Sequence, residues 1–444
     1  MNNRIRAWDV AGTIDFKLTD DFQLKSISAY QYTDGRFSTD ADATPFGISG
    51  SVNRQRYRQL TQELRLNGST GTFLDWTLGA YYFNGKGYLY TYNIISPGLA
   101  NETVNVADDY IPTTSRSLFA HAVWHLTDRM NLTGGIRYTD DKKSYAFQRL
   151  NPFVPGAPAY TAAGRINGLE STYSGSRWDY RINLDYRFTD DVMAYAQFST
   201  GYRGGGVNPR PFIIEQAVPF GPETLNAYEI GLKTDFLDRR LRLNLSAFLN
   251  DYQDMIFSNT APTVVNGVVL SAVNGTPVNA GDGRFVGVEL EASMRLIDGL
   301  TVDANVSHLD FELRRVGVAG ASITGIALDN VAPYVTRWKA GAGIQYRAEL
   351  GAHGSLSPRI DIAYQSSFYT NIDNNPATLT PAYAVTNARL AWQSPDESWD
   401  VGLAVTNLFD RFYYQNKFRG PAIQSVTGQP AAPRQWSVTV KREF

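Results

Sequence analysis

Apolar and polar side chains alternate along most of this sequence, and the alternation limits the possible folds more than any other feature. A period of two places successive side chains on opposite faces of an extended strand. Residues 178–188 keep this period without a break, and their apolar members are Trp178, Tyr180, Ile182, Leu184, Tyr186 and Phe188. Comparable runs occur near residues 8–18, 74–82, 118–126, 130–138, 241–249, 286–296, 338–346, 399–405 and 436–444. The sequence therefore predicts an all-β protein.

The connections between these runs come in two lengths. Short polar turns are expected at residues 19–21, 127–129, 189–191, 237–240, 297–299 and 394–397. Longer segments rich in glycine, proline and asparagine lie near residues 34–56, 84–114, 141–172, 203–222, 259–282 and 415–433. Transmembrane β-barrels have short turns at one end and long loops at the other, and each strand needs only about 10 alternating residues. We therefore expect an antiparallel transmembrane β-barrel, surrounded by lipid in the cell outer membrane of a Gram-negative bacterium.

The number of strands suggests that the barrel is incomplete. About seventeen strands can be counted in residues 1–444, whereas single-chain bacterial barrels normally have an even number. The first ten residues also lack the apolar segment of a secretory signal peptide. We therefore expect residues 1–444 to form one partial barrel domain whose leading strands are missing. Such a piece forms either a curved, incomplete wall or a strained closure between the strands at 8–18 and 434–444.

Neither composition nor motifs indicate catalysis. The chain has no cysteine, a net charge of −2, and no phosphate-binding loop or nucleophile elbow. His121 and His125 share a strand face but lie about 13 Å apart, too far to bind one metal ion. Glu289 and Glu291, about 6.8 Å apart on one face, overlap the spacing of glycosidase carboxylates, but we interpret them as carboxylates facing the barrel interior. We expect no enzyme activity, no cofactor, no metal site and no nucleic-acid partner.

Aromatic residues and arginines gather in the expected long loops. Aromatic rings beside guanidinium groups can bind a siderophore, a sugar or an aromatic compound. The same residues also suit an interfacial aromatic girdle or simple packing between loops. The candidate ligand-contacting residues are Tyr88, Tyr90, Tyr92, Arg203, Arg210, Phe212, Tyr413, Tyr414 and Arg419.

Several segments together resemble the C-terminal barrel of TonB-dependent receptors. They are Phe198–Pro209 (FSTGYRGGGVNP), Pro222–Lys233 (PETLNAYEIGLK), Gly287–Glu291 (GVELE), Asn407–Asp410 (NLFD) and the ending from Pro433 (PRQW) to Phe444. The resemblance implies a barrel of about 22 strands around an N-terminal plug, of which about five strands, the plug and the TonB-contact segment are missing here. It also implies energised uptake of a scarce small-molecule ligand, such as a siderophore-bound metal or another bulky nutrient. The TonB complex is then a partner only through the missing N-terminal part.

The last strand carries a further expected signal. Trp436, Val438, Val440 and Phe444 fall on one face and end in an aromatic residue, which resembles the signal recognised by the barrel assembly machinery. The alternative is an ordinary amphipathic edge strand.

Two other classes of protein share the alternation. A passive porin-like channel would have a constriction loop and would conduct ions without a ligand. A soluble extracellular β-protein, either an adhesin or a glycan-active protein, would bury the apolar faces in its core and stay in the aqueous phase on detergent extraction.

Overall fold

The structure is a computed structural model that describes residues 3–40, 49–95, 103–158, 164–211, 213–265, 268–317, 326–420 and 425–443. The long strands of the first half are β1 (Arg4–Lys17), β2 (Phe22–Asp40), β3 (Ser49–Thr70), β4 (Leu74–Ile95), β5 (Thr103–Thr127), β6 (Met130–Ala146), β8 (Glu170–Thr189), β9 (Val192–Arg203) and β12 (Glu223–Phe236). Those of the second half are β13 (Leu241–Val265), β14 (Val268–Ile297), β15 (Leu300–Val316), β16 (Trp338–Tyr346), β18 (Ser355–Gln365), β21 (Tyr383–Gln393), β22 (Trp399–Thr406) and β25 (Gln435–Arg442).

The remaining elements are short. The minor strands are β7 (Arg149–Leu150), β10 (Gly206–Val207), β11 (Pro219–Phe220), β17 (Ala348–Glu349), β19 (Phe368–Tyr369), β20 (Leu379–Thr380), β23 (Tyr414–Gly420) and β24 (Ser425–Pro430). The helices are single 3₁₀ turns, η2 (Ile214–Gln216), η3 (Gly351–His353) and η4 (Pro376–Thr378). No helix in the described ranges is long and apolar enough to cross a membrane.

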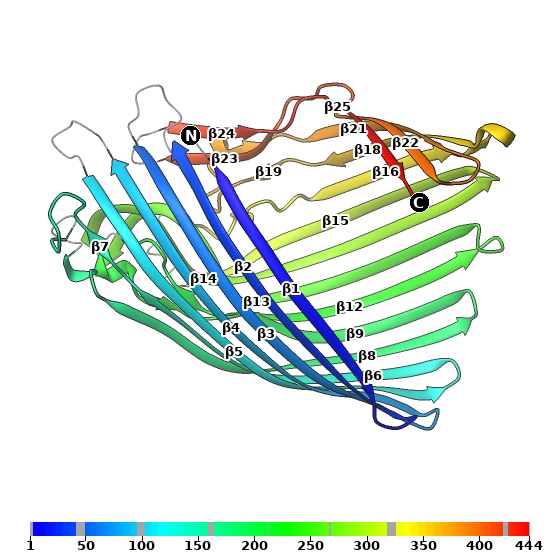
Figure 1. Cartoon of the computed structure of the whole chain (residues 1–444), viewed down its shortest axis with the longest axis horizontal. Helices are drawn as coiled ribbons and strands as arrows, with labels where there is room; N and C mark the ends of the chain where they lie inside the picture. Colours follow the sequence, from blue (N-terminus) through cyan, green and yellow to red (C-terminus); the bar gives the residue numbers. More distant parts are fainter. Residues whose placement is uncertain are drawn as a thin grey trace.

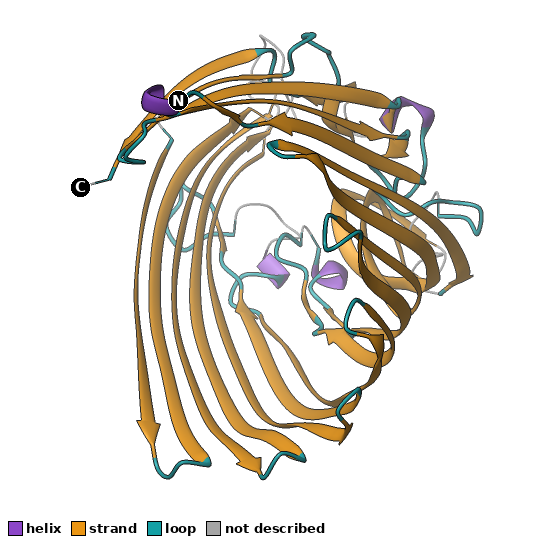
Figure 2. Ribbon diagram, turned by 90° about the vertical axis from the view of Figure 1, so that its right-hand side faces the viewer, coloured by secondary structure: helices purple, strands orange, loops and turns teal. Residues whose placement is uncertain are grey.

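One antiparallel sheet of nineteen strands forms the wall, and in it each long strand pairs with the next long strand along the chain. The same pairing continues from β9 through β12 to β25. The predicted all-β, antiparallel architecture is therefore confirmed. The sheet is not closed, because β1 pairs only with β2 and β25 only with β22 within the described residues. Of the two expected forms, the incomplete curved wall is the one observed (Figure 2).

The two ends of the wall differ, as the sequence predicts. Short turns join the strands at one end, and the long loops lie at the other, to the left in Figure 1. Strands β3 and β4 contain 22 residues each, so each is about 75 Å long at about 3.4 Å per residue. The apolar band of such barrels is only about 25 Å tall. These strands therefore extend well beyond the apolar band toward the long loops.

The polar face of the wall is its concave face. On β6, Tyr145 shares a face with Arg137 and packs on Phe147 and Ile166 of the segment that follows β6. Loops lie within the curve of the wall (Figure 2). The opposite face carries the apolar residues and is open. On β8, Trp178 is 51% exposed. A protein whose large apolar side chains are exposed over a continuous outer face needs a membrane or a partner to cover them.

Candidate ligand-binding site

At the long-loop end of the wall, a hollow of about 290 Å³ lies beside strands β16, β18 and β21. Its lining residues are Tyr334, Thr336, Lys339, Gln365, Phe368, Tyr383, Tyr413 and Gln415. Lys339 lies directly opposite Gln365, and Gln365 directly opposite Tyr383, so these side chains leave the sheet on the same face. That face is the concave one, because Lys339 alternates with the outward Trp338. We call this set of eight residues the mouth hollow.

Aromatic rings give the mouth hollow flat apolar surfaces. The rings of Tyr383 and Tyr413 are stacked, with centroids 4.0 Å apart and planes inclined by 19°. The rings of Tyr334 and Phe368 lie 5.8 Å apart at an angle of 35°. Because stacked and tilted aromatic pairs are favourable, such rings can hold a planar ring of a bound molecule.

Polar groups in the mouth hollow are placed to bind a ligand. The Thr336 hydroxyl is buried and has no hydrogen-bond partner within the described part of the chain. The Tyr334 hydroxyl donates to Asn416 Oδ1 at 2.8 Å. Tyr334 is 49% exposed, yet partial desolvation of its hydroxyl raises the pKa of that group, which keeps it a neutral donor at physiological pH. With the exposed Lys339 ammonium, the hollow offers one cation, hydroxyl groups and amides.

Two of the predicted ligand-contacting residues lie next to the mouth hollow on β23. Tyr414 contacts Phe412 edge-on at 5.1 Å, and the Lys417 ammonium lies 5.2 Å from the centre of the Tyr414 ring. Arg419 forms an ion pair with Asp373 at 3.4 Å. Tyr413 is therefore the predicted residue that lines the hollow, whereas Tyr414 and Arg419 make contacts within the protein beside it.

The three predicted tyrosines of β4 do not face the interior. Tyr88, Tyr90 and Tyr92 lie on the same face of β4 as the outward residues Trp76 and Leu78, because the pairing of β4 with β3 has no register shift. The three tyrosine side chains therefore lie on the outer face of the wall, between the apolar band and the long loops.

The remaining predicted residues are on or near the loops. Arg203 is the exposed last residue of β9, and Arg210 is exposed in the following loop, where its N–H donates to Asn208 Oδ1 at 3.1 Å. Phe212 and Phe444 lie outside the described residues. Trp436, Val438 and Val440 project from one face of β25 and are 64%, 71% and 60% exposed.

A buried ion pair between Asp109 of β5 and Arg149 of β7 holds the segment after β6 against the concave face of the wall. Arg149 Nη1 donates to Asp109 Oδ1 at 2.6 Å, and the two side chains are 5% and 1% exposed. Asp109 also accepts a hydrogen bond from the Tyr145 hydroxyl at 3.2 Å and one from the Gln148 N–H at 3.0 Å. These contacts join β5, β6 and the loop after β6. They form a structural network that ties these segments together.

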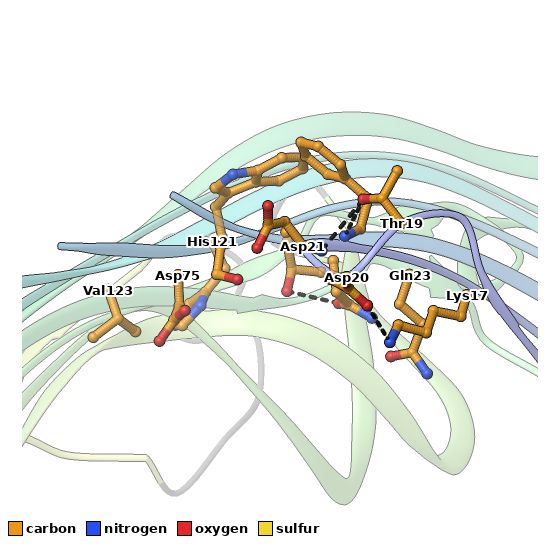
Figure 3. A pocket seen from close by; sticks show the side chains of 14 residues that line it. Lys17, Thr19, Asp20, Asp21, Gln23, Asp75, His121 and Val123 are labelled. Carbon is orange, nitrogen blue, oxygen red and sulfur yellow. Dashed lines mark hydrogen bonds and ion pairs between the residues drawn. The ribbon is translucent and has the colours of Figure 1, made fainter. Parts of the chain in front are cut away.

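A second hollow, of about 470 Å³, lies at the short-turn end of β1–β5 (Figure 3). Three of its polar side chains, those of Lys17, Thr19 and Asp20, are engaged in the turn itself. Lys17 donates to Asp20 at 2.6 Å, and the Thr19 hydroxyl accepts from the N–H groups of Asp21 and Phe22 at 3.3 and 3.1 Å. No group of three or more metal-ligating side chains occurs among the described residues, here or elsewhere.

The fold and its two faces define a class of protein, a transmembrane β-barrel with an apolar outside and a polar inside. The family model described as "TonB dependent receptor-like, beta-barrel" matches residues 2–408. The chain belongs to this family, whose members are Gram-negative outer-membrane proteins, as the sequence resemblance predicts.

Curated relatives are receptors that share moderate identity with the chain. The pesticin receptor of Yersinia enterocolitica is 28% identical over 402 residues, which cover 89% of this chain and 52% of the receptor. The ferric-pyoverdine 358 receptor of Pseudomonas putida is 23% identical over 94% of this chain and 45% of the receptor. The chain thus spans about half the length of the curated relatives it matches.

Solved structures share the fold. The ferric yersiniabactin uptake receptor of Yersinia pestis superimposes with a TM-score of 0.79 at 24% identity, over 99% of this chain and 62% of that one. The siderophore receptor PiuA of Acinetobacter baumannii gives a TM-score of 0.72 at 18% identity, over 100% of this chain and 65% of that one. At these identities, the superpositions establish the barrel fold.

Proposed function

We propose that this chain forms the wall and the ligand-binding mouth of an outer-membrane receptor that takes up a scarce, bulky nutrient such as a siderophore-bound metal. The observation that carries the proposal is the mouth hollow, which lies on the polar concave face of a wall whose outer face is apolar. Receptors for ferric siderophores among the relatives support the same class of ligand. The chain binds its ligand without covalent chemistry.

The mouth hollow suits one arm of a siderophore complex better than a small inorganic ion. The stacked rings of Tyr383 and Tyr413 offer a surface to a phenolate or catecholate ring, and Lys339 offers a charge to an anionic complex.

Removing one ring from the mouth hollow is expected to weaken ligand binding. In outer membranes containing the chain, ferric yersiniabactin or ferric pyoverdine should bind saturably, and the Tyr413→Ala variant should bind about tenfold more weakly because an aromatic pair is lost. The Tyr88→Ala variant is a matched control, since Tyr88 faces outward. Binding is measured with the radioactive iron complex in filtered membranes.

Three results contradict the proposal. Equal binding losses in the Tyr413→Ala and Tyr88→Ala variants would mean that the mouth hollow is not the site. Ion conductance across a planar bilayer in the absence of any ferric complex would favour the passive porin-like channel. Recovery of the chain in the aqueous phase after detergent extraction would favour the soluble extracellular protein.

The last strand is assigned to recognition by the barrel assembly machinery. Trp436 and Val438 form an apolar outward stripe on β25, in direct register with Val405 and Leu403 of β22. We expect the Trp436→Ser/Val438→Ser variant to reach the outer membrane in severalfold lower amounts, measured by immunoblotting of urea-washed membranes. The Ser437→Ala/Thr439→Ala control changes the opposite face of the strand and should accumulate normally. Equal amounts of all three proteins would indicate an ordinary edge strand.

A further inference from the structure

Seven cationic side chains gather on the outward face of β1–β4, at the end nearest the long loops. We call this set the cationic belt, and its members are Arg4, Arg6, Arg36, Arg54, Arg56, Arg58 and Lys86. The pairings of β1 with β2, of β2 with β3 and of β3 with β4 contain no register shift. Alternation therefore places the belt on the same outward face as Ile14, Leu24 and Leu64, which point away from the enclosed interior.

Like charges lie directly opposite each other in the belt. Arg4 pairs with Arg36, and Arg36 pairs with Arg54, so three arginines stand side by side on three successive strands. On the next strand pair, Arg58 lies opposite Lys86. Because like charges directly opposite across strands destabilise a sheet, this arrangement calls for an anion outside the chain.

The carboxylates on this face are too few to neutralise the belt. In the described residues of β1–β5 they are Asp34, Asp40 and Asp108 at the same end of the strands. Asp34 is engaged by Arg54 through two hydrogen bonds of 3.0 and 2.8 Å. Within the described ranges, no ion pair joins a carboxylate to Arg36, Arg56 or Arg58, and all three side chains are exposed.

The outward face of β13–β15 shows the contrast. There each arginine at the same end of the wall has its own carboxylate. Arg284 holds Asp251 with a contact of 2.6 Å, Arg314 lies 3.2 Å from Glu312, and Arg337, just before β16, lies 3.0 Å from Asp310. Charge on that sector is balanced within the chain, whereas charge on the belt is not.

The belt begins where the apolar outer face ends. Trp8 is the next residue after Arg6 on the outward face of β1, on the side away from the long loops. Its ring lies 5.4 Å from that of Tyr30 and 5.9 Å from that of Tyr32. Below these rings, Val10 is 64% exposed and Leu60 is 45% exposed. Rows of Trp and Tyr mark the level of the polar headgroups in membrane barrels. The belt therefore stands at the headgroup level of the leaflet nearest the long loops.

A hollow of about 350 Å³ lies within the belt and gives it a defined centre. Its lining holds three cations and one carboxylate, and the residues are Arg36, Val52, Asn53, Arg54, Arg56, Tyr88, Tyr90 and Asp108. The Arg56 guanidinium stacks over the Tyr88 ring at 5.4 Å, which fixes its orientation, and Asp34 fixes Arg54. Guanidinium groups bind phosphate through paired N–H donors, and basic clusters beside a membrane segment bind anionic lipid headgroups.

We propose that the cationic belt binds a phosphorylated lipid of the outer leaflet, with the phosphate groups in the hollow between β2, β3 and β4 and the acyl chains along the apolar face below. The proposal depends on the position of the chain in the outer membrane and not on the ligand of the mouth hollow. It explains why Tyr88 and Tyr90 face outward beside arginines: they support guanidinium groups at the membrane surface.

The full chain, purified from outer membranes in a neutral detergent, is titrated with diphosphoryl lipid A and bound lipid is counted by native mass spectrometry. We expect binding by the unmodified chain and about a hundredfold weaker binding by the Arg36→Gln/Arg56→Gln/Arg58→Gln variant, because three cations are lost near an anionic headgroup. The matched control removes three cations from the balanced sector in the Arg284→Gln/Arg314→Gln/Arg337→Gln variant, and it should bind as the unmodified chain does.

Further controls distinguish the effects of lost charge, of the lipid phosphates and of misfolding. The Arg36→Lys/Arg56→Lys/Arg58→Lys variant keeps the charge and should keep most of the binding, which shows that the loss in the glutamine variant is not misfolding. Dephosphorylated lipid A should not bind. Unchanged binding by the belt glutamine variant overturns the proposal, as does an equal loss in the balanced-sector control. Full displacement of the lipid by inorganic phosphate added in equal molar concentration to the lipid also overturns it, since the site would then take free phosphate.

Discussion

Replacing Leu245 with lysine is expected to destabilise the membrane-inserted chain by about 2–4 kcal/mol, the cost of a lysine facing lipid near the middle of the bilayer. Leu245 is the central member of the apolar run on β13 and is 45% exposed. Its cross-strand neighbours on the same face are Leu232 and Leu290, each 37% exposed. If this face lies against hydrocarbon, no water reaches the new ammonium group, and the long side chain must bend toward a distant headgroup.

The adjacent residue provides the control. Asn244 points to the concave face, opposite Glu291, and lines a hollow of about 400 Å³. A lysine there has room, water and a carboxylate, so the Asn244→Lys variant should lose less than about 1 kcal/mol. Stability is compared from the urea concentration that releases each variant from outer membranes. If Asn244→Lys is the damaging change and Leu245→Lys is tolerated, the apolar face is a buried core and the chain is not a membrane barrel.

The fold is largely predictable from the sequence because the alternation of apolar and polar residues is a local pattern within each strand. In a strand, one residue in two faces lipid, so a run such as Trp178 to Phe188 shows both strand and face without knowledge of any partner strand. The expected turns and loop segments lie at opposite ends of the wall, but much of the expected loops at 34–56, 84–114 and 259–282 belongs to long strands such as β4 (Leu74–Ile95), β5 (Thr103–Thr127) and β14 (Val268–Ile297). The sequence is compatible with two forms, an open wall and a closed one. It does not decide between them, because pairing of β1 with β25 depends on curvature accumulated over the whole sheet.

The mouth hollow was only partly predictable because it depends on register and loop paths. Tyr413 was identified from its aromatic cluster, whereas Lys339, Gln365 and Tyr383 were not. Each of these three has a visible signal, since it is a polar or aromatic residue on the concave face at the long-loop end of a strand. The three side chains come together only because β16, β18 and β21 pair in one particular register. The alternation of apolar and polar residues does not determine that register when the connecting loops differ in length.

Outward aromatic residues show a second limit. The sequence predicts that Tyr88, Tyr90 and Tyr92 are loop residues, but β4 continues without a register shift as far as Ile95. Counting the period of two from Trp76 places all three tyrosines on the outer face. The error came from ending the strand where its apolar residues end, although a barrel strand can extend above the membrane with polar residues on both faces.

Replacing Arg149 with methionine is expected to release the loop between β6 and β8 from the inside of the wall. Asp109 would keep its hydrogen bonds from Tyr145 and Gln148 but lose its counter-ion while only 1% exposed. Removal of one partner of a buried ion pair typically costs about 3–5 kcal/mol, because the remaining charge is left desolvated. Arg149 also stacks on Phe147 at 5.3 Å, but methionine retains much of that apolar contact.

Proteolysis at Arg165, an exposed residue of the same loop whose side chain is 66% exposed, measures this release. Cleavage by trypsin on intact outer membranes should become at least about a hundredfold faster in the Arg149→Met variant, because local opening costs less by several kcal/mol. The Asp109→Asn/Arg149→Met variant removes both charges and should recover most of the protection, since no unpaired charge remains. Equal cleavage of the single and double variants would show that the loop is held by its apolar contacts with Tyr145, Ile166 and Ala217, and that the ion pair contributes little.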